Sequence, residues 1–437
     1  MDRFRKSREL YVEFSGICPG GVHSSVRFHS EIGHPIYFSK AQGSKIWDID
    51  GNEFIDCIIG FGAIILGHGH PKVTQAVKEA IDNGLTAGIE TELSYTVSKK
   101  LADIIPCAES VKLSTSGTEA IMHAIHIVRG YTGKEFIMKP EGCYNGWYDS
   151  VLLSNHPPEH AHGPLMEPNV HLESAGILKE TAGKTVVYPF NDGNAFANLV
   201  KKYKERLAGI IIAPVVYSGG CVLPDQGYLQ GVREVAEEND VPLIFDEVIT
   251  GFRCAPGGAQ ELYGVTPDIA IFGKAIANGY PLSAVVGKKE IMEVTTPGAE
   301  VGWQGTYNAH QIALAAASAS LDELSDGRVQ TYLASNAEFL ANEFNKMAAD
   351  SKIGHMVTCG GILTPYFTTR RITNTRERTS DKQMFMLFWN ELIENQILIK
   401  PSHLDWFGLT AAHDHEDIER ITAAIEFALR KVKESRN

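Results

Sequence analysis

The chain of 437 residues is 44% hydrophobic and carries a formal net charge of −13 at pH 7. This length and apolar content allow a large buried core and roughly two to four domains. Because acidic residues are dispersed and no long basic run occurs, we expect neither nucleic acid nor a membrane as a partner. No stretch approaches about 18 uninterrupted apolar residues, and residues 1–22 lack the apolar core of a secretion signal, so we expect a cytoplasmic protein.

The seven cysteines and sixteen histidines show no pattern of metal ligands or disulfides. The cysteines are scattered without a C-x-x-C pair, which is typical of reduced thiols. The histidines lack H-E-x-x-H spacing, and we interpret the pairs His123/His126 and His68/His70 as structural. We therefore predict no metal site.

Three stretches of different character follow one another along the chain. Residues 33–57 predict a small antiparallel sheet with an Asp-Gly turn between two alternating runs. From about residue 105 to 290, short apolar runs alternate with helical patterns, which indicates a mostly parallel sheet covered by helices on both faces. From about residue 309 onward, we expect long amphipathic helices, a short strand region and a final helix over 416–432. The predicted strands in the middle stretch include 134–139, 207–216, 241–246 and 268–273, with a helix over 228–239.

These patterns predict an α/β fold with two domains. The large domain spans 56–308, and a smaller α+β domain combines 1–55 with 309–437. Two polar loops stand out, and their composition predicts mobility: 156–176 as a lid and 368–381 as a surface loop.

A capped helix after a short strand predicts an anion site. The stretch "LSTSGTEAIMHAIHIVRGYTG" (113–133) places Ser116 and Glu119 in the S-x-x-E pattern of a capping box. Small residues such as Gly117 and Thr118 leave backbone N–H groups open at the helix N-terminus, which favours an anion such as phosphate. The alternative is a well-capped helix without a ligand.

Two carboxylates end a buried strand in "LIFDEVITGFR" (243–253). Ligands of open α/β sheets bind beyond the carboxyl ends of the strands, so Asp246 and Glu247 are candidates for a working acid. Strand alternation sends them to opposite sides, so at most one of them faces a shared site. A buried carboxylate needs a cation or a protonated ring nitrogen as partner, and for Glu247 the alternative is a structural ion pair with Arg253.

A lysine follows the next predicted strand in "TPDIAIFGKAIANGYPLSAVVG" (266–287). Lys274 stands 28 positions after Asp246, which suits one βα repeat that brings two strand ends together. The alternative is a lysine whose stem alone is covered. Yet a lysine in an apolar pocket becomes a nucleophile. An anion site, a buried acid and a lysine at strand ends together fit pyridoxal 5'-phosphate (PLP), which needs all three.

Several long motifs carry a family resemblance over nearly the whole chain. They are "CPGGVHSSVRF", "KIWDIDGNEFIDCIIGFGAIILGHGHP", "STSGTEAIMHAIHIVRGYTG", "EGCYNGWYDS", "LIFDEVITGFR", "DIAIFGKAIANGYPLSAVVG", "GTYNAH" and "KPSHLDWFGLTAAH". With them the chain resembles the class III, fold-type I PLP-dependent aminotransferases. Within that class it is most similar to the glutamate-1-semialdehyde 2,1-aminomutase group.

The resemblance implies a role for each matched cofactor residue. Lys274 would form the Schiff base and shuttle a proton, and Asp246 would keep the pyridine nitrogen protonated. Tyr144 would stack on the ring. Ser116, Gly117 and Thr118 would bind the phosphate, while Thr306 would reach the phosphate of a neighbouring subunit. The family pattern therefore implies a homodimer with a shared active site.

The resemblance also implies substrate-binding residues. Arg27 matches the position that binds a substrate carboxylate, a task suited to a bidentate guanidinium. Asp405 falls where the aminomutases have a glutamate, and it would pair with Arg27 in the absence of substrate. Trp147, together with Trp303 and Trp406, adds aromatic bulk in segments that line the family's active site.

Departures from the aminomutase pattern decide the functional hypotheses. The Y-H-G of the aminomutases is Tyr144-Asn145-Gly146 here, and their E-P-V followed by an asparagine is Ala213-Pro214-Val215 with Ser218. The stretch from Ser218 to Cys221 resembles that of β-amino acid aminotransferases. The leading hypothesis is an aminotransferase that moves an amino group between a carboxylate-bearing amine, such as a β-amino acid, and a keto acid by a ping-pong mechanism. The alternatives are glutamate-1-semialdehyde aminomutase itself, an isomerase that forms 5-aminolevulinate, and a PLP-binding protein with little catalysis.

Overall fold

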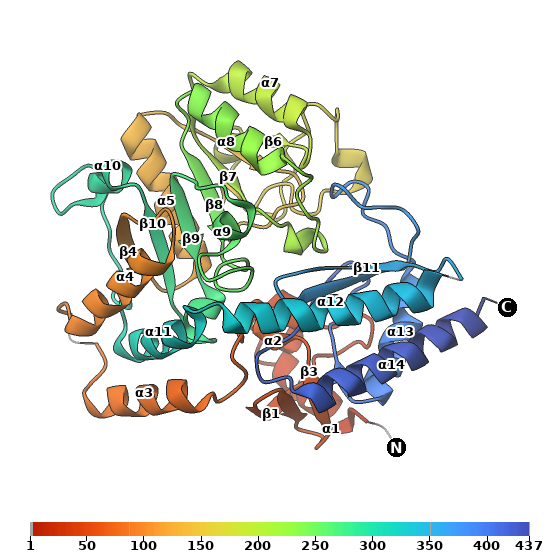
Figure 1. The fold of residues 1–437 in the computed structure, drawn as a ribbon. Coiled ribbons are helices and arrows are strands. Elements are labelled where there is room, and N and C mark those ends of the chain that lie inside the picture. Colours follow the sequence, from red (N-terminus) through yellow and green to blue (C-terminus); the bar gives the residue numbers. More distant parts are fainter. Residues whose placement is uncertain (1–2, 87, 350, 437) are drawn as a thin grey trace. The chain divides into compact units, whose positions relative to one another are not determined.

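The computed structural model describes residues 3–86, 88–349 and 351–436, which form two compact units. The large unit comprises Pro71–Ala334 and Arg371–Arg378, and the small unit comprises Met1–His70, Ser335–Arg370 and Thr379–Asn437. Figure 1 shows the elements of both units in chain order. None of the helices within the described ranges is long and apolar enough to cross a membrane.

A seven-stranded sheet forms the centre of the large unit, in the order β4-β10-β9-β8-β7-β5-β6. Its strands are β4 (Ser110–Ser114), β5 (Phe136–Pro140), β6 (Thr185–Tyr188), β7 (Leu207–Ile212), β8 (Leu243–Glu247), β9 (Ile269–Phe272) and β10 (Ser283–Gly287). Only β10 runs antiparallel to its neighbours, and the other pairs are parallel. The predicted mostly parallel sheet is therefore confirmed, and strands β5 to β9 are buried along their whole length because both faces are covered.

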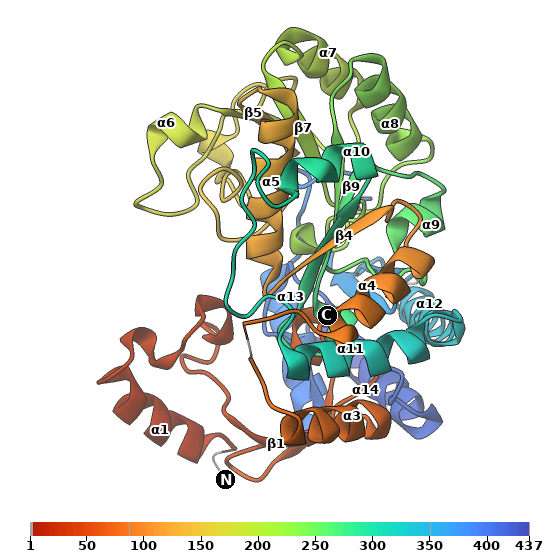
Figure 2. The same ribbon diagram turned by 90° about the vertical axis from the view of Figure 1, so that its left-hand side faces the viewer.

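Helices cover both sides of this sheet, and Figure 2 shows α5 on one side and α9 on the other. The helices of the large unit are α3 (Pro71–Asp82), α4 (Glu92–Ile104), α5 (Gly117–Thr132), α6 (Lys179–Ala182), α7 (Gly193–Tyr203), α8 (Tyr228–Glu238), α9 (Ala259–Tyr263), α10 (Lys289–Met292) and α11 (Gln311–Leu324). The core between α5 and the sheet consists of fully buried residues such as Ala124, Ile125 and Val128.

The small unit contains two sheets. One has the order β1-β2-β3-β13, and the other is β11-β12-β14. Their strands are β1 (Phe38–Gln42), β2 (Lys45–Asp48), β3 (Glu53–Asp56), β11 (His355–Cys359), β12 (Ile362–Tyr366), β13 (Ile397–Leu398) and β14 (Phe407–Gly408). The antiparallel piece predicted over 33–57 is confirmed, and Gly51 has a φ of 93° in the turn between β2 and β3. The helices of this unit are α1 (Arg5–Ser15), α2 (Ile59–Gly62), α13 (Lys382–Glu394) and α14 (His415–Glu434).

The compact units begin and end at other residues than the domain bounds at 56 and 308 expected from the sequence. Helix α11 packs against α3 and α4, so the chain stays with the large unit beyond residue 308. Helix α12 (Arg328–Ala349) then contains the boundary between Ala334 and Ser335.

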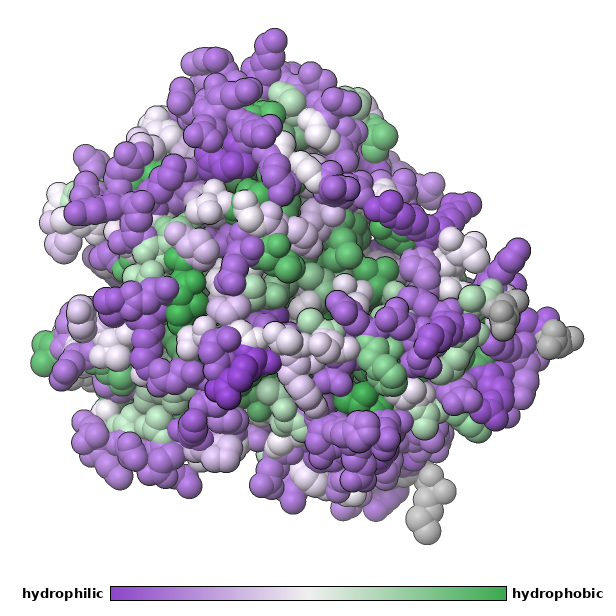
Figure 3. Space-filling view, in the orientation of Figure 1, coloured by the Kyte–Doolittle hydropathy of each residue, from purple (hydrophilic) through white to green (hydrophobic). Residues whose placement is uncertain are grey.

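The face shown in Figure 3 is mainly hydrophilic, with apolar residues in smaller groups between the polar ones.

Candidate active site at the ends of strands β8 and β9

A cavity of about 260 Å³ lies in the large unit, next to the carboxyl ends of β8 and β9. Six of the residues predicted for the cofactor line it: Ser116, Gly117, Thr118, Tyr144, Asp246 and Lys274. They come from the start of α5, the loop after β5, the end of β8 and the second residue after β9. The parallel strands bring these residues together because each strand ends at the same edge of the sheet.

The N-terminus of α5 contributes the polar wall of the cavity. Ser116 and Glu119 form the predicted capping box, since each side chain binds the backbone N–H of the other. The amides of Gly117 and Thr118, at the first two helical positions, have no acceptor within the helix and carry the positive end of its dipole. A Cβ at Gly117 would lie 3.2 Å from both methyl carbons of Val248, so glycine leaves the backbone accessible. This wall has the properties of an anion site.

Asp246 provides the acid of the cavity. Its side chain accepts hydrogen bonds from Asn145 Nδ2 at 2.8 Å and from the amide of Val248 at 3.1 Å. Burial raises the pKa of Asp246, whereas these two donors and the charge of Lys274 oppose the increase. A carboxylate in this setting gains free energy from a nearby cation. Its neighbour Glu247 points to the other side of β8, as the strand alternation predicts.

Lys274 is partly buried and lines the same cavity as Asp246. It is the first residue of a short 3₁₀ helix that begins one residue beyond β9, after Gly273, and its φ of 47° lies in the left-handed region. Residues other than glycine adopt this region at a cost in free energy, and such positions are concentrated at functional sites. The adjacent strands β8 and β9 are parallel, with Asp246 opposite Ile271. The predicted juxtaposition of the acid and the lysine is therefore present.

The sequence analysis recorded Asn145 only as a departure from a family pattern, and the structure places it beside Asp246. Asn145 is 1% exposed, and its Oδ1 has no hydrogen-bond partner among the described residues. Next to it, Tyr144 is 44% exposed, and its amide donates to Ser218 Oγ at 3.0 Å. The place of Asn145 directly after Tyr144 was a signal that it lies near the cofactor site. Its contact with Asp246 on β8 joins distant parts of the chain, so the sequence could not predict it.

A second residue missed by the sequence analysis is Lys139 on β5. Its ammonium group is fully buried and donates to the carbonyls of Cys143 and Leu153 and to Asn155 Oδ1, at 2.6–2.9 Å. Burial lowers the pKa of Lys139 to about 8. Lys139 thus binds the base of the loop that carries Tyr144. The predicted strand over 134–139 ends at Lys139, but the acceptors of its ammonium group lie in the segment that follows and could not be predicted.

Two further predicted residues of the large unit lie outside the cavity lining. Trp147 is 66% exposed, and its amide donates to Thr118 Oγ1 at 3.1 Å. Thr306 is exposed in the segment between α10 and α11. Its expected role concerns a neighbouring subunit and stays a prediction.

Arg27 and Asp405 belong to the small unit, and the structure does not pair them. Asp405 Oδ2 accepts a hydrogen bond from Lys400 Nζ at 2.6 Å, which corrects the expected pair with Arg27. The reason is local, because Lys400 is only five residues away and its Nζ lies 4.8 Å from the ring centroid of Trp406. Arg27 is exposed, so its guanidinium can bind a solvent-borne carboxylate.

Comparisons with known proteins agree on one family. The family model described as aminotransferase class-III matches residues 28–405. A glutamate-1-semialdehyde 2,1-aminomutase from Methanocaldococcus jannaschii is 37% identical over 423 residues, which cover 96% of this chain and 97% of the relative. The crystal structure of an omega-transaminase from Sphaerobacter thermophilus superposes with a TM-score of 0.92 at 27% identity, covering 99% of this chain and 100% of that chain. A β-phenylalanine aminotransferase from Variovorax paradoxus shares the fold, with a TM-score of 0.87 at 24% identity over 98% of this chain and 94% of that chain.

The residues around the cavity fit PLP in three respects. The start of α5 offers free amides to a phosphate, Asp246 offers a buried acceptor to a protonated ring nitrogen, and Lys274 offers an amine to an aldehyde. The unpartnered Oδ1 of Asn145 adds one more acceptor beside Asp246. Among the described residues, no group of three or more His, Cys, Asp or Glu side chains is arranged to hold a metal ion.

Proposed function

Because the chain belongs to the class III aminotransferase family, whose members bind PLP, we propose that it moves an amino group between a carboxylate-bearing amine and a keto acid. A β-amino acid is the proposed amine. The observation that carries the proposal is the meeting of Lys274, Asp246 and the N-terminus of α5 in one cavity. When bound there, PLP supplies an aldehyde that receives the amino group and a ring that withdraws electrons.

The residues of the chain divide the work as follows. Lys274 Nζ binds the aldehyde and moves a proton to and from the substrate carbon that carries the amino group. Asp246 keeps the ring nitrogen protonated through a buried ion pair, and Asn145 orients the carboxylate of Asp246. Tyr144 covers one face of the ring. The backbone amides at the start of α5 bind the phosphate.

Substrate recognition and assembly complete the proposal. Arg27 binds the substrate carboxylate with its guanidinium, and Trp147 supports an apolar substituent larger than that of glutamate semialdehyde. Thr306 reaches the phosphate of a second subunit, so the active enzyme is a homodimer. The exposed position of Thr306 supports this role, because its hydroxyl is accessible to another chain.

Three departures from the aminomutase pattern line the cavity, namely Asn145, Ala213 and Ser218. Their position beside the cofactor residues supports a reaction other than that of the aminomutases. Val215 and Val248 add apolar surface, which suits an apolar substituent on the amine.

The second candidate function is glutamate-1-semialdehyde 2,1-aminomutase, which moves the amino group within one molecule. Sequence similarity favours this isomerase over the transferase, because the relative that carries this name is 37% identical along almost the whole chain. The two candidates share the cofactor residues and differ in whether a separate donor and acceptor are needed.

One experiment separates them. The holoenzyme is mixed with single amines (glutamate, alanine, β-phenylalanine and 4,5-diaminovalerate) in the absence of a keto acid, and the PLP absorbance band is followed. For the transferase we expect one amine to remove the band and a keto acid to restore it. Formation of 5-aminolevulinate from glutamate-1-semialdehyde without an added donor would instead establish the aminomutase. Absence of both reactions would refute both candidates.

A further inference from the structure

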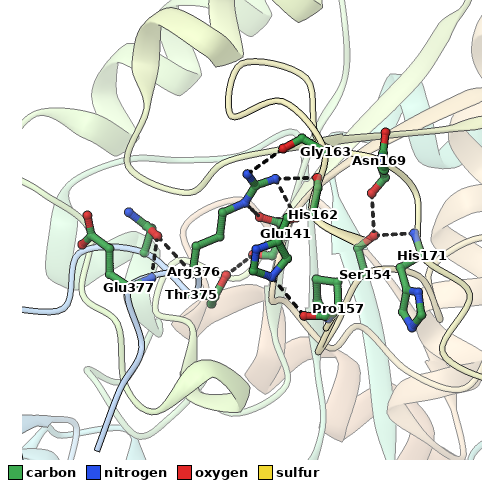
Figure 4. Close-up of polar contacts among 11 residues, drawn as sticks. Glu141, Ser154, Pro157, His162, Gly163, Asn169, His171, Thr375, Arg376 and Glu377 are labelled. Atoms are coloured by element: carbon green, nitrogen blue, oxygen red, sulfur yellow. Dashed lines mark hydrogen bonds and ion pairs between the residues drawn. The ribbon is translucent and has the colours of Figure 1, made fainter. Parts of the chain in front are cut away.

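Residues 371–378, hereafter the docked segment, bind the large unit through a buried ion pair. The segment belongs to the polar loop that we expected to be mobile, yet Arg376 is only 16% exposed in its side chain and pairs with Glu141, which is 2% exposed. Figure 4 shows the guanidinium of Arg376 facing the carboxylate of Glu141. The two residues are 235 positions apart in the sequence.

All three nitrogen atoms of the Arg376 guanidinium donate hydrogen bonds. Nε and Nη2 form a bidentate pair with the two carboxylate oxygens of Glu141, at 2.5 and 3.1 Å. Nη2 also donates to the carbonyl of His162 at 2.7 Å, and Nη1 donates to the carbonyl of Gly163 at 3.2 Å. One side chain therefore connects the loop after β5 with the 156–176 loop (Figure 4).

The 156–176 loop is also tied at its base. Ser154 Oγ donates to the carbonyl of Asn169 at 3.2 Å and accepts a hydrogen bond from the amide of His171 at 2.9 Å (Figure 4). Arg376 binds the same loop at residues 162 and 163, which lie between Ser154 and Asn169 in the sequence. Arg376 therefore adds contacts to the loop at residues 162 and 163, which Ser154 does not contact directly.

The docked segment also packs against the backbone of two of the loops that line the cavity, the one after β5 and the one after β7. Gly142 has a φ of 80°, and a Cβ there would lie 2.1 Å from Thr375 Cγ2. A Cβ at Gly219 would lie 2.8 Å from the same carbon. Thr375 Oγ1 donates to the carbonyl of Glu141 at 3.2 Å, and Arg378 donates to the carbonyl of Ser218 at 3.1 Å. The residues that follow these contacts in the loop after β5 are Cys143, Tyr144 and Asn145.

We propose that Arg376 is a positioning residue for the cofactor site, acting through Glu141 to fix the loop that carries Tyr144 and Asn145. The charge pair is placed at the first residue of that loop, and Thr375 lies so close to Gly142 and Gly219 that a Cβ at either glycine would clash with it. The inference rests on the PLP site of the family and is independent of the choice between transferase and aminomutase.

The matched control lies in the same segment. Arg371 pairs with Asp225, but the two side chains are 80% and 41% exposed. An exposed pair contributes little, because water and salt screen it, whereas removal of one partner from a buried pair leaves an unpaired charge. Arg371→Gln is therefore expected to behave like the unaltered protein in every measurement below.

The experiment compares holoenzymes of Arg376→Gln, Arg376→Lys and Arg371→Gln. We expect Arg376→Gln to release PLP about tenfold faster on dilution and to change the circular dichroism of the PLP band, because a small displacement of Tyr144 and Asn145 alters the surroundings of the ring. Arg376→Lys keeps the charge but loses the bidentate geometry, so we expect partial rescue. Cleavage of the 156–176 loop by a protease should accelerate in Arg376→Gln alone.

A double variant separates positioning from general stability. Arg376→Met with Glu141→Met removes both charges, so no unpaired charge remains buried and much of the stability should return. If PLP release stays fast in the double variant while urea unfolding returns to normal, positioning is supported. Recovery of PLP retention together with stability would overturn the proposal, as would equal PLP release from Arg376→Gln and Arg371→Gln.

Discussion

The neighbouring carboxylates Asp246 and Glu247 lie on opposite sides of β8 and have different hydrogen-bond partners. Asp246 and Glu247 are 8% and 0% exposed, and burial raises the pKa of both. Glu247 accepts hydrogen bonds from the hydroxyl of Thr250 and from the amides of Ala259 and Gln260, all within 13 positions along the chain. Asp246 has two donors, Asn145 Nδ2 and the amide of Val248, and otherwise faces the cavity.

The difference teaches how to distinguish a structural acid from a functional one. Two of the donors to Glu247 are N–H groups at the start of α9, so this carboxylate caps a helix that follows β8. A Cβ at Gly258 would lie 2.6 Å from Glu247 Oε2, so the chain closes tightly around this carboxylate. Asp246 retains a side that faces the cavity, where a ligand can reach it. The predictions below test this contrast, beginning with the largest effect.

The largest effect is expected on the cavity side, at Lys274. Lys274→Ala should lower turnover about 10⁴-fold or more and abolish the absorbance band of the imine, because no other lysine lines the cavity within the described part of the chain. The control is Lys201→Ala, which removes an exposed lysine of α7 and should leave both unchanged. Turnover retained by Lys274→Ala would contradict the assigned role.

Isosteric substitutions on the two sides of β8 should affect different properties of the protein. Asp246→Asn should weaken PLP binding about a hundredfold, or about 3 kcal/mol, because the ring nitrogen loses its anionic partner. Glu247→Gln should lower the free energy of unfolding by about 2 kcal/mol, because hydrogen bonds to a charged acceptor are lost. Fluorescence titration with PLP and urea unfolding measure the two quantities. Equal effects on PLP affinity would remove the distinction between the two acids.

Lys139 extends the same contrast to a buried cation. Its folded-state pKa is about 8, against 10.5 for the unfolded chain, so the unfolded state binds more protons between these pH values. Stability from this group must therefore rise with pH over that range, by at most about 3 kcal/mol. The variant Lys139→Met has no ammonium group that could titrate at this position. The free energy of unfolding of the wild type minus that of Lys139→Met should increase from pH 7 to pH 10. A constant difference would contradict a lowered pKa of Lys139 in the folded state.

The smallest predicted effect concerns the apoprotein. Because burial raises the folded-state pKa of Asp246 above 3.8, this group contributes stability that is fully present below pH 3.8 and is lost as the pH rises through the folded-state pKa. Asp246→Asn has no such loss, so the variant without PLP should be more stable than the wild type at neutral pH. Urea unfolding between pH 5 and 8 measures the difference, which should shrink towards the acidic end. Addition of PLP should reverse the order at neutral pH.

Much of the site could be predicted because its signals are local in sequence. The capping box of Ser116 spans four residues, and Lys274 stands two positions after the end of a fully apolar strand. Asp246 was expected to share a site with Lys274 because one βα repeat separates them, and adjacent parallel strands β8 and β9 confirm this. The class III family was named from the same motifs, and the family comparison confirms it.

The remaining features depend on contacts between distant segments, which no local pattern encodes. Arg376 looks like any other charge in a polar loop until Glu141 is brought beside it. The sequence analysis expected Arg27 as the partner of Asp405, and the structure shows Lys400 in that place. No sequence motif indicated Lys400 as a partner. Helix α11 was assigned to the small domain because its amphipathic pattern does not reveal that its partners are α3 and α4.

The chain crosses between the two compact units four times, at residues 70/71, 334/335, 370/371 and 378/379. For anyone who builds chimaeras within this family, the large unit is therefore not one contiguous piece of coding sequence. A fragment restricted to 71–334 lacks the cation that neutralises Glu141, and an exchange of the C-terminal third replaces that cation along with the C-terminal part of the small unit. Recombination points within this family should keep residues 371–378 with the same parent as residue 141.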